Sequence, residues 1–182
     1  REAAVLVGGS RALAQFAVKG QQTMAVKGDI PAVLAFIRTK LCSAGVVVMV
    51  SGDPGYFSLL DALRREFPPQ QLQVIPGISS VQFAFSRLAL PWHGARLLSL
   101  HGRSPKLPEL AYEPGLLLGI LTDAVQNSRT VPQLLLQNGW PKDTELFICV
   151  RLSYEDEQIV STTLAGAASV PEFVHCILVV KA

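Results

Sequence analysis

The sequence predicts an α/β protein made of two α/β/α domains, with a mostly parallel sheet first and a mixed sheet second. The longest apolar runs, at residues 45–50, 116–121 and 176–180, fit buried strands, because a parallel sheet covered on both faces gives continuous runs of Val, Ile and Leu. Strands and helices alternate in the first half, which implies right-handed βαβ crossovers. Residues 145–162 contain two strands with no room for a helix, so the second sheet should be mixed.

In the first half, Asp29 and Pro31 are start signals for a helix that runs to about residue 42. Pro91 and Trp92 suggest a boundary that divides residues 1–92 from residues 93–182. Strands are expected at residues 3–7, 23–26, 45–50 and 72–75, and helices at 10–18, 31–42, 56–67 and 79–88. Beyond the boundary, strands are expected at residues 96–100, 116–122, 145–152, 158–162 and 174–180, with a helix at 130–138.

Composition excludes several classes of protein. The chain of 182 residues is 49% hydrophobic, yet its apolar runs are far shorter than the roughly 20 residues that span a membrane. A net charge of +2 is too small to suggest a nucleic-acid partner. The three cysteines lack metal-ligand spacing, so we expect reduced thiols in a cytoplasmic protein and no metal site.

The segment SGDPG at residues 51–55 is the most informative candidate site. It follows the strongest strand, and loops at the carboxyl ends of parallel strands are where α/β proteins bind ligands. Its glycines allow close approach of a ligand, and Asp53 can accept hydrogen bonds from an amine or hydroxyl. A plain turn in which Asp53 caps the next helix is the alternative, and the residues alone leave both open.

Three other strand ends carry polar residues. Ser79 and Ser80 follow a Pro-Gly turn, where one serine should cap a helix and the other could reach a ligand. His101 and Arg103 follow residues 96–100 and have the chemistry to bind carboxylates, although a solvated loop would look the same. Thr122 ends another strand. Asp123, which follows it, could simply cap the next helix. Dinucleotide, phosphate-loop and nucleophile-elbow motifs are absent.

Three longer segments together resemble a known family. VVVMVSGDPGYFSLLDALRREFP, VIPGISSVQFAFSRLALPW and ARLLSLHGR are similar to the tetrapyrrole methylases, and SLHGR favours the branch that methylates carbon five of corrin precursors. The likeness continues through ILTDAVQNS and the region of Arg151 to Tyr154. It implies two domains with S-adenosylmethionine in the cleft between them. The cofactor residues that it implies are Gly52, Asp53, Pro54, Ser79 and Ser80 on one wall, and Thr122, Tyr154 and Ile159 on the other.

The same resemblance implies the chemistry. A methyl group would move from a sulfonium to a ring carbon, which needs alignment and exclusion of water rather than a protein nucleophile. The acceptor carries many carboxylates, so His101 and Arg103 are the first choices to hold it, followed by Arg129 and Arg87. His101 is also the candidate general base. A homodimer is expected, and a separate methyltransferase would carry out the decarboxylating step.

One feature departs from the family pattern. Tetrapyrrole methylases open with a strand and a glycine-rich loop at the cofactor site, whereas this sequence starts in the second strand, so we expect the first strand to be missing. Three other functions stay open at this point. They are another methylase of the superfamily such as diphthine synthase, a non-catalytic binding or assembly protein, and a flavodoxin-like nucleotide-binding domain.

Overall fold

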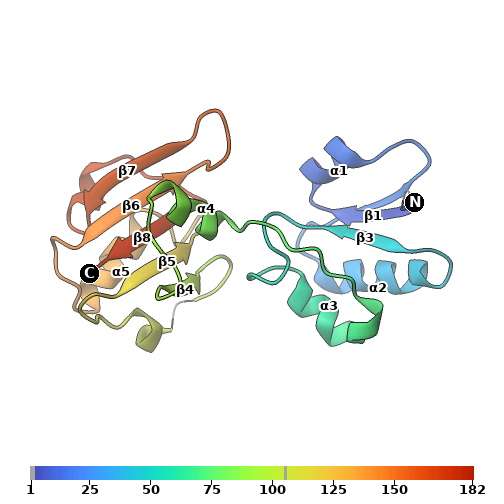
Figure 1. Ribbon diagram of the computed structural model, residues 1–182, viewed down its shortest axis with the longest axis horizontal. Helices are drawn as coiled ribbons and strands as arrows, with labels where there is room; N and C mark the ends of the chain where they lie inside the picture. Colours follow the sequence, from blue (N-terminus) through green and yellow to red (C-terminus); the bar gives the residue numbers. More distant parts are fainter. Residues whose placement is uncertain (1–2, 105) are drawn as a thin grey trace. The chain divides into compact units, whose positions relative to one another are not determined.

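The computed structural model describes residues 3–104 and 106–182 (Figure 1). The chain divides into two compact units, the first ending at Ser79 and the second beginning at Ser80. This division comes before the turn at Pro91 and Trp92. The reason is that helix α4 (Ser80–Arg87) packs against strands β5 (Leu117–Leu121) and β8 (Ile177–Lys181) of the second sheet.

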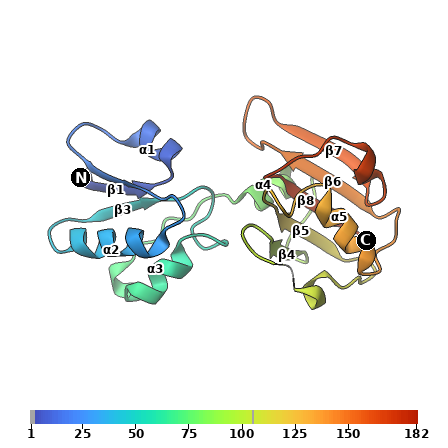
Figure 2. The ribbon, with the colours of Figure 1, turned by 180° about the vertical axis from the view of Figure 1, so that it is seen from behind.

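The first unit contains a parallel three-stranded sheet in the order β2-β1-β3. Its first crossover moves from β1 to β2, and the next moves back past β1 to β3, so right-handed connections place their helices on opposite faces. Accordingly α1 lies on one face, and α2 and α3 lie on the other (Figures 1 and 2). The elements are β1 (Val5–Gly8), α1 (Ser10–Phe16), β2 (Gln22–Ala25), α2 (Ile30–Leu41), β3 (Val46–Met49) and α3 (Leu60–Glu66).

Local sequence explains where α2 begins. The Asp29 carboxylate accepts a hydrogen bond from the Ala32 amide at 3.0 Å, and Pro31 occupies the first turn, where its missing N–H costs nothing. This confirms the predicted start. The apolar face of the helix buries Val33 and Ile37 against Val7 of β1.

The strand predicted at residues 72–75 is wrong. After the short turn η1 (Pro69–Gln71) this segment pairs with no strand among the described residues, and Ile75 is 75% exposed. An apolar run forms a strand only when a neighbour satisfies its main-chain groups. The outer edge of β3 also has no described partner, and Val47 on it is 45% exposed although its run of valines is typical of an interior strand.

The second unit contains a mixed five-stranded sheet in the order β4-β5-β8-β6-β7. β4 and β5 are parallel and the remaining pairs are antiparallel, which confirms the predicted fold class. Helices α4 and α5 cover opposite faces (Figures 1 and 2). The remaining elements are β4 (Arg96–Ser99), η2 (Leu107–Leu110), α5 (Thr130–Gln137), β6 (Glu145–Val150), β7 (Gln158–Thr163) and η3 (Gly166–Ser169).

Side-chain alternation along β5 explains its glycine. Leu118 and Ile120 point into the core beneath α5 and are fully buried. Gly119 therefore faces α4, where a Cβ would lie 2.8 Å from Cε2 of Phe85 and 2.9 Å from Cγ1 of Val81. The helix packs this closely only because the position has no side chain.

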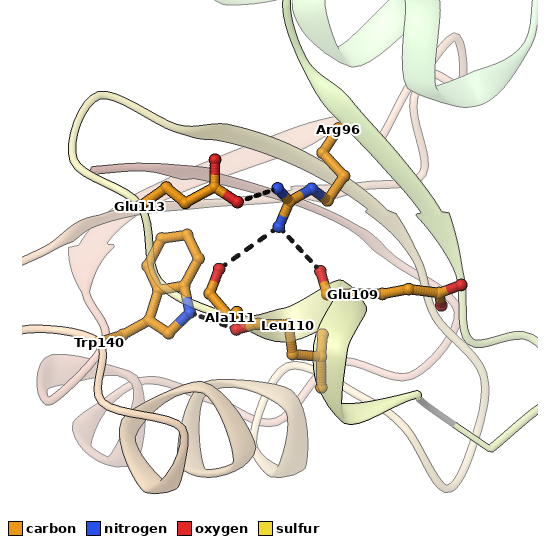
Figure 3. A network of polar contacts seen from close by, with 6 residues as sticks. All are labelled: Arg96, Glu109, Leu110, Ala111, Glu113 and Trp140. Atoms are coloured by element: carbon orange, nitrogen blue, oxygen red, sulfur yellow. Dashed lines mark hydrogen bonds and ion pairs between the residues drawn. The ribbon is translucent and has the colours of Figure 1, made fainter.

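A polar network holds the long connection between β4 and β5 (Figure 3). The indole Nε1 of Trp140 donates to the carbonyl of Leu110 at 2.7 Å, and both residues are buried. The Arg96 guanidinium bonds the carbonyls of Glu109 and Ala111 at 3.3 and 3.4 Å and forms an ion pair with Glu113. The far end of the loop that begins with His101 is thus anchored to the unit.

None of the helices in residues 3–104 and 106–182 has the length and apolar character needed to cross a membrane. The same residues contain no group of three or more histidines, cysteines or acids arranged to hold a metal ion.

The contact of Gly119 with α4 predicts a stability change. We expect Gly119→Ala to lower the free energy of unfolding by about 1–3 kcal/mol, because the added methyl group has to displace buried side chains. Urea denaturation followed by circular dichroism measures this. Gly94→Ala is the matched control, because nothing lies within 4 Å of its Cβ and its φ is not positive. Equal free energies for the two variants would contradict the packing described for β5.

Candidate active site

The Asp53 carboxylate joins the two ligand-binding candidates of the first unit. Its Oδ1 accepts from the Gly55 amide at 2.8 Å, within the loop that follows β3. Its Oδ2 accepts from the Gly77 amide at 3.1 Å, in the turn that precedes α4. Residues 51–55 and the turn at Gly77 therefore meet, although the segment before Gly77 forms no strand of the sheet. Asp53 serves this turn, not the N-cap of α3, which is Leu59.

Close contact between main chains explains the glycines of these two loops. A Cβ on Gly77 would lie 2.5 Å from the carbonyl oxygen of Gly52, so no larger residue fits there without moving the loop. Gly52 itself has a φ of 75°, which favours glycine. Pro54 follows in the same loop and is partly buried.

A buried hydroxyl group beside this loop has no hydrogen-bond partner among the described residues. Among the buried side-chain polar atoms of residues 3–104 and 106–182, the Tyr56 hydroxyl has no hydrogen-bond partner. Burial raises its pKa to about 12, so it is a neutral donor at all physiological pH values. A buried polar group without a partner is costly, which suggests that something other than protein satisfies it. Ser79, which follows the turn at Gly77, is buried, whereas Ser80 is exposed at the start of α4.

In the second unit, three strand ends meet at one edge of the sheet. The ladders align Ser99 of β4 with Leu121 of β5, and Leu121 with Ile177 of β8. The residues that follow β4 and β5 therefore lie beside those that precede β8. The Nδ1 atom of His101 is 3.2 Å from the carbonyl oxygen of Thr122, and the rings of His101 and His175 are 5.9 Å apart at their centroids, tilted by 49°.

Thr122 fixes this edge. Its hydroxyl donates to the Cys176 carbonyl at 2.6 Å and accepts from the Cys176 amide at 2.8 Å, and the residue is 4% exposed. Cys176 carries a free thiol whose pKa is raised by burial. The hydroxyl of Thr122 is therefore engaged by protein, and its predicted role in cofactor binding stays a prediction.

Asp123 closes the loop that carries His101. Its carboxylate accepts from the amide of Gly102 at 2.7 Å, from that of Val125 at 2.8 Å and from that of Gln126 at 2.7 Å. These main-chain hydrogen bonds lower the pKa of Asp123, and the one from Gly102 has the largest effect on it. The acid caps a turn rather than the next helix, since α5 begins only at Thr130. Arg103 is exposed in the connected loop.

The other predicted residues lie elsewhere in the second unit. Arg129 donates to the carbonyls of Ala168 and Val170 at 2.5 and 2.9 Å. Arg87 forms an ion pair with Glu157 at 2.6 Å, and Glu157 also accepts from the Ser153 amide of the β6–β7 loop. Tyr154 lies in that loop beneath the Arg151 guanidinium, and Ile159 is 38% exposed on β7. The structure brings His101 and Thr122 together. Their predicted functions, like those of the remaining residues, stay predictions.

Sequence reasoning missed two residues of these sites, Tyr56 and His175. The sequence pattern places Tyr56 at the start of a helix, yet α3 begins later, at Leu60. It also places His175 inside a strand at residues 174–180. The strand β8 begins at Ile177 because His175 has a φ of 53°, outside the β region. A polar side chain directly before a buried apolar run was the available signal.

Comparison with known proteins gives one consistent result. A family model described as tetrapyrrole (corrin/porphyrin) methylases matches residues 2–168. Cobalt-precorrin-7 C(5)-methyltransferase from Salmonella typhimurium is 32% identical over 155 residues, which cover 85% of this chain and 75% of that protein.

Solved structures share the fold. Precorrin-6Y methylase from Archaeoglobus fulgidus superposes with a TM-score of 0.70 at 22% identity, covering 98% of this chain and 84% of the other. Uroporphyrin-III C-methyl transferase from Thermus thermophilus, complexed with S-adenyl homocysteine, gives a TM-score of 0.75 at 22% identity, covering 99% and 86%. The arrangement of strands and loops described above is therefore that of these methylases.

The lowered pKa of Asp123 predicts a pH dependence. A carboxylate with a folded-state pKa below its unfolded value of about 3.9 stabilises the protein above that pH and stops doing so as the pH falls through the folded pKa. Asp123→Asn should therefore be less stable than the wild type at about pH 7, and the difference should shrink below about pH 4. Urea midpoints of both proteins across this range test it. A difference that does not change with pH would contradict the expected linkage.

Proposed function

The chain belongs to the tetrapyrrole (corrin/porphyrin) methylases, and we propose that it transfers a methyl group from S-adenosylmethionine to carbon five of a corrin precursor of the cobalt-precorrin-7 or precorrin-6 type. The likeness to the Salmonella enzyme, which extends over most of the chain, carries this proposal. Enzymes of this family use S-adenosylmethionine, and the protein is accordingly a C-methyltransferase.

Residues of the first unit suit the amino-acid portion of the methyl donor. A carboxylate has about four lone-pair sites, so Asp53 can accept from a ligand ammonium in addition to the two amides that it already binds. The Tyr56 hydroxyl is a donor without a described protein partner, and a ligand carboxylate would satisfy it. Gly52 and Gly77 keep the loops free of side chains. When bound, S-adenosylmethionine supplies the methyl carbon attached to a positive sulfur.

His101 suits the role of general base. Replacing a ring hydrogen by a methyl group from a sulfonium releases one proton, which has to be accepted. The carbonyl of Thr122 can only accept a hydrogen bond, so the Nδ1 atom of His101 carries the hydrogen in that contact. In the neutral ring the lone pair is then on Nε2, the nitrogen that can take the proton.

Cationic side chains would hold the carboxylates of the acceptor. Arg103 lies in the same loop as His101 and is exposed, which favours it. Arg129 and Arg87 are second choices. Their guanidinium groups bind the carbonyls near η3 and the Glu157 carboxylate respectively. Binding such an acid-rich substrate would disrupt these contacts or add to them.

We further propose that the protein is a cytoplasmic homodimer and that a separate methyltransferase carries out the decarboxylating step. The free cysteines Cys42, Cys149 and Cys176 support a reducing compartment. Burial raises the pKa of Cys149 to about 12, which keeps this thiol unreactive. Analytical ultracentrifugation tests the dimer directly.

The first test of this function is cofactor binding. In calorimetry we expect the full-length natural chain to bind S-adenosylhomocysteine with a Kd on the order of 1–100 µM. Tyr56→Phe should weaken binding about three- to tenfold, the effect of one hydrogen bond, without lowering the stability of the protein. Asp53→Ala should weaken binding further and also loosen the loop. Tyr112→Phe, in the other unit, is the control. No binding by folded full-length protein would reject the enzyme in favour of a binding or assembly protein.

The second test concerns the base. We expect His101→Gln to reduce kcat for methylation of the corrin precursor by about 100-fold or more, because proton removal loses its acceptor. Transfer of a radiolabelled methyl group measures the rate, and calorimetry should show unchanged binding of S-adenosylhomocysteine. His93→Gln is the matched control among the chain's three histidines. Wild-type activity in His101→Gln would assign proton removal to water.

A further inference from the structure

His175 lies at the same sheet edge as the candidate base. It precedes β8, whose first residue is aligned with the end of β5, and its ring contacts that of His101 at a centroid distance of 5.9 Å. Both side chains are exposed. Two imidazoles thus border one surface, although they are 74 positions apart in the printed sequence.

The position of His175 is held by buried hydrogen bonds of its neighbour. The Cys176 amide and carbonyl are both bound to the Thr122 hydroxyl, at 2.8 and 2.6 Å. The φ of 53° at His175 would suit Asn or Gly at least as well as His. The hydrogen bonds of the main chain therefore explain the left-handed backbone at position 175. They do not explain why the side chain there is an imidazole.

Two acids in the connected loops already accept hydrogen bonds from other groups. Asp123 accepts three main-chain N–H groups, and the Glu172 carboxylate accepts from Nδ2 of Asn127 at 2.7 Å. Cys176 is a neutral buried thiol, and Arg103 adds positive charge to the loop of His101. Within the described ranges, neither imidazole forms an ion pair with a carboxylate. This edge therefore has donors suited to a carboxylate that comes from a ligand.

Exposed apolar side chains lie in the two segments that follow β5 and precede β8. Val174 precedes His175 and is 47% exposed, and Val125 in the loop after β5 is 71% exposed. Their two segments are held together by hydrogen bonds between Ser128 and Phe173 at 2.7 and 3.1 Å. Exposed apolar groups next to carboxylate-binding donors match a flat ring system that carries acidic side chains.

We propose that His175 binds a carboxylate side chain of the tetrapyrrole acceptor and so holds the macrocycle next to His101. This assignment rests on the proposed function and adds a specificity residue to it. His175 donates a ring N–H to the carboxylate, while His101 keeps its Nε2 lone pair for the proton. The two histidines thus have different tasks, binding for His175 and chemistry for His101.

Kinetics of His175→Asn test this division. Asn retains the left-handed backbone and removes the ring, so thermal unfolding should not change. The KM for the corrin precursor should rise about tenfold, the effect of one charge-assisted hydrogen bond, while kcat stays within about twofold. His175→Gln, whose longer side chain carries its amide N–H donor farther out than Asn does, should recover part of the loss. His93→Asn should leave both constants unchanged.

A binding experiment tests the ligand chemistry directly. Cobyrinic acid, a stable corrin polycarboxylate, is titrated into the full-length protein and followed by tryptophan quenching, and its methyl ester is the second probe. Esterification should weaken binding to the wild type, and it should weaken binding to His175→Asn much less.

The outcomes separate the two levels of the hypothesis. Wild-type protein that binds S-adenosylhomocysteine but methylates no corrin precursor would overturn the proposed function, and this inference with it. Wild-type protein that methylates the precursor, together with an unchanged KM in His175→Asn and an equal ester effect in both proteins, would overturn the role of His175 alone.

Discussion

The buried hydrogen bonds between the Thr122 hydroxyl and the main chain of Cys176 are the constraint on which the second unit's functional edge depends. They join the end of β5 to the start of β8 across a sequence separation of 54 residues. His101 is bound to the carbonyl of the same threonine, and His175 is the residue next to the same cysteine. Loss of the hydroxyl would leave the buried Cys176 amide unpaired, at a cost of about 1–3 kcal/mol, whereas the Cys176 carbonyl would still accept from the Thr122 amide at 3.3 Å. One short side chain thus helps to set the positions of both imidazoles.

Asp53 has the same function in the first unit. Its carboxylate connects two loops that are 24 residues apart, and the glycines at positions 52 and 77 allow the main chains to meet. In each unit a small polar side chain at the carboxyl end of a strand satisfies main-chain donors or acceptors of a second segment. Such residues look like ligand-binding candidates in a sequence because the same hydrogen-bonding capacity serves both purposes. Any effect of replacing them on ligand binding therefore includes an effect on loop position.

Most of the fold could be predicted from the sequence, because long apolar runs and helix-cap residues are local signals. The valines of β3, the Asp29 cap of α2 and the two adjacent strands of the β6–β7 hairpin could all be read directly. Residues 72–75 could not, since their apolar pattern says nothing about whether a partner strand is present. The left-handed backbone at His175 and the Arg129 contacts with carbonyls 39 and 41 residues away depend on tertiary structure, so no local pattern reports them. The likeness of SLHGR to one methylase branch suggested the substrate class, which the properties of single residues did not indicate.

The outer edge of β3, which pairs with no other strand among the described residues, bears on how the protein behaves in solution. Unpaired N–H and C=O groups along an apolar strand can template pairing with a strand of another molecule. Neither a charged side chain nor a proline interrupts Val46–Met49, so this edge lacks the usual protection against such pairing. Val46–Met49 is therefore one of the edge strands of the described fold at which such pairing can begin.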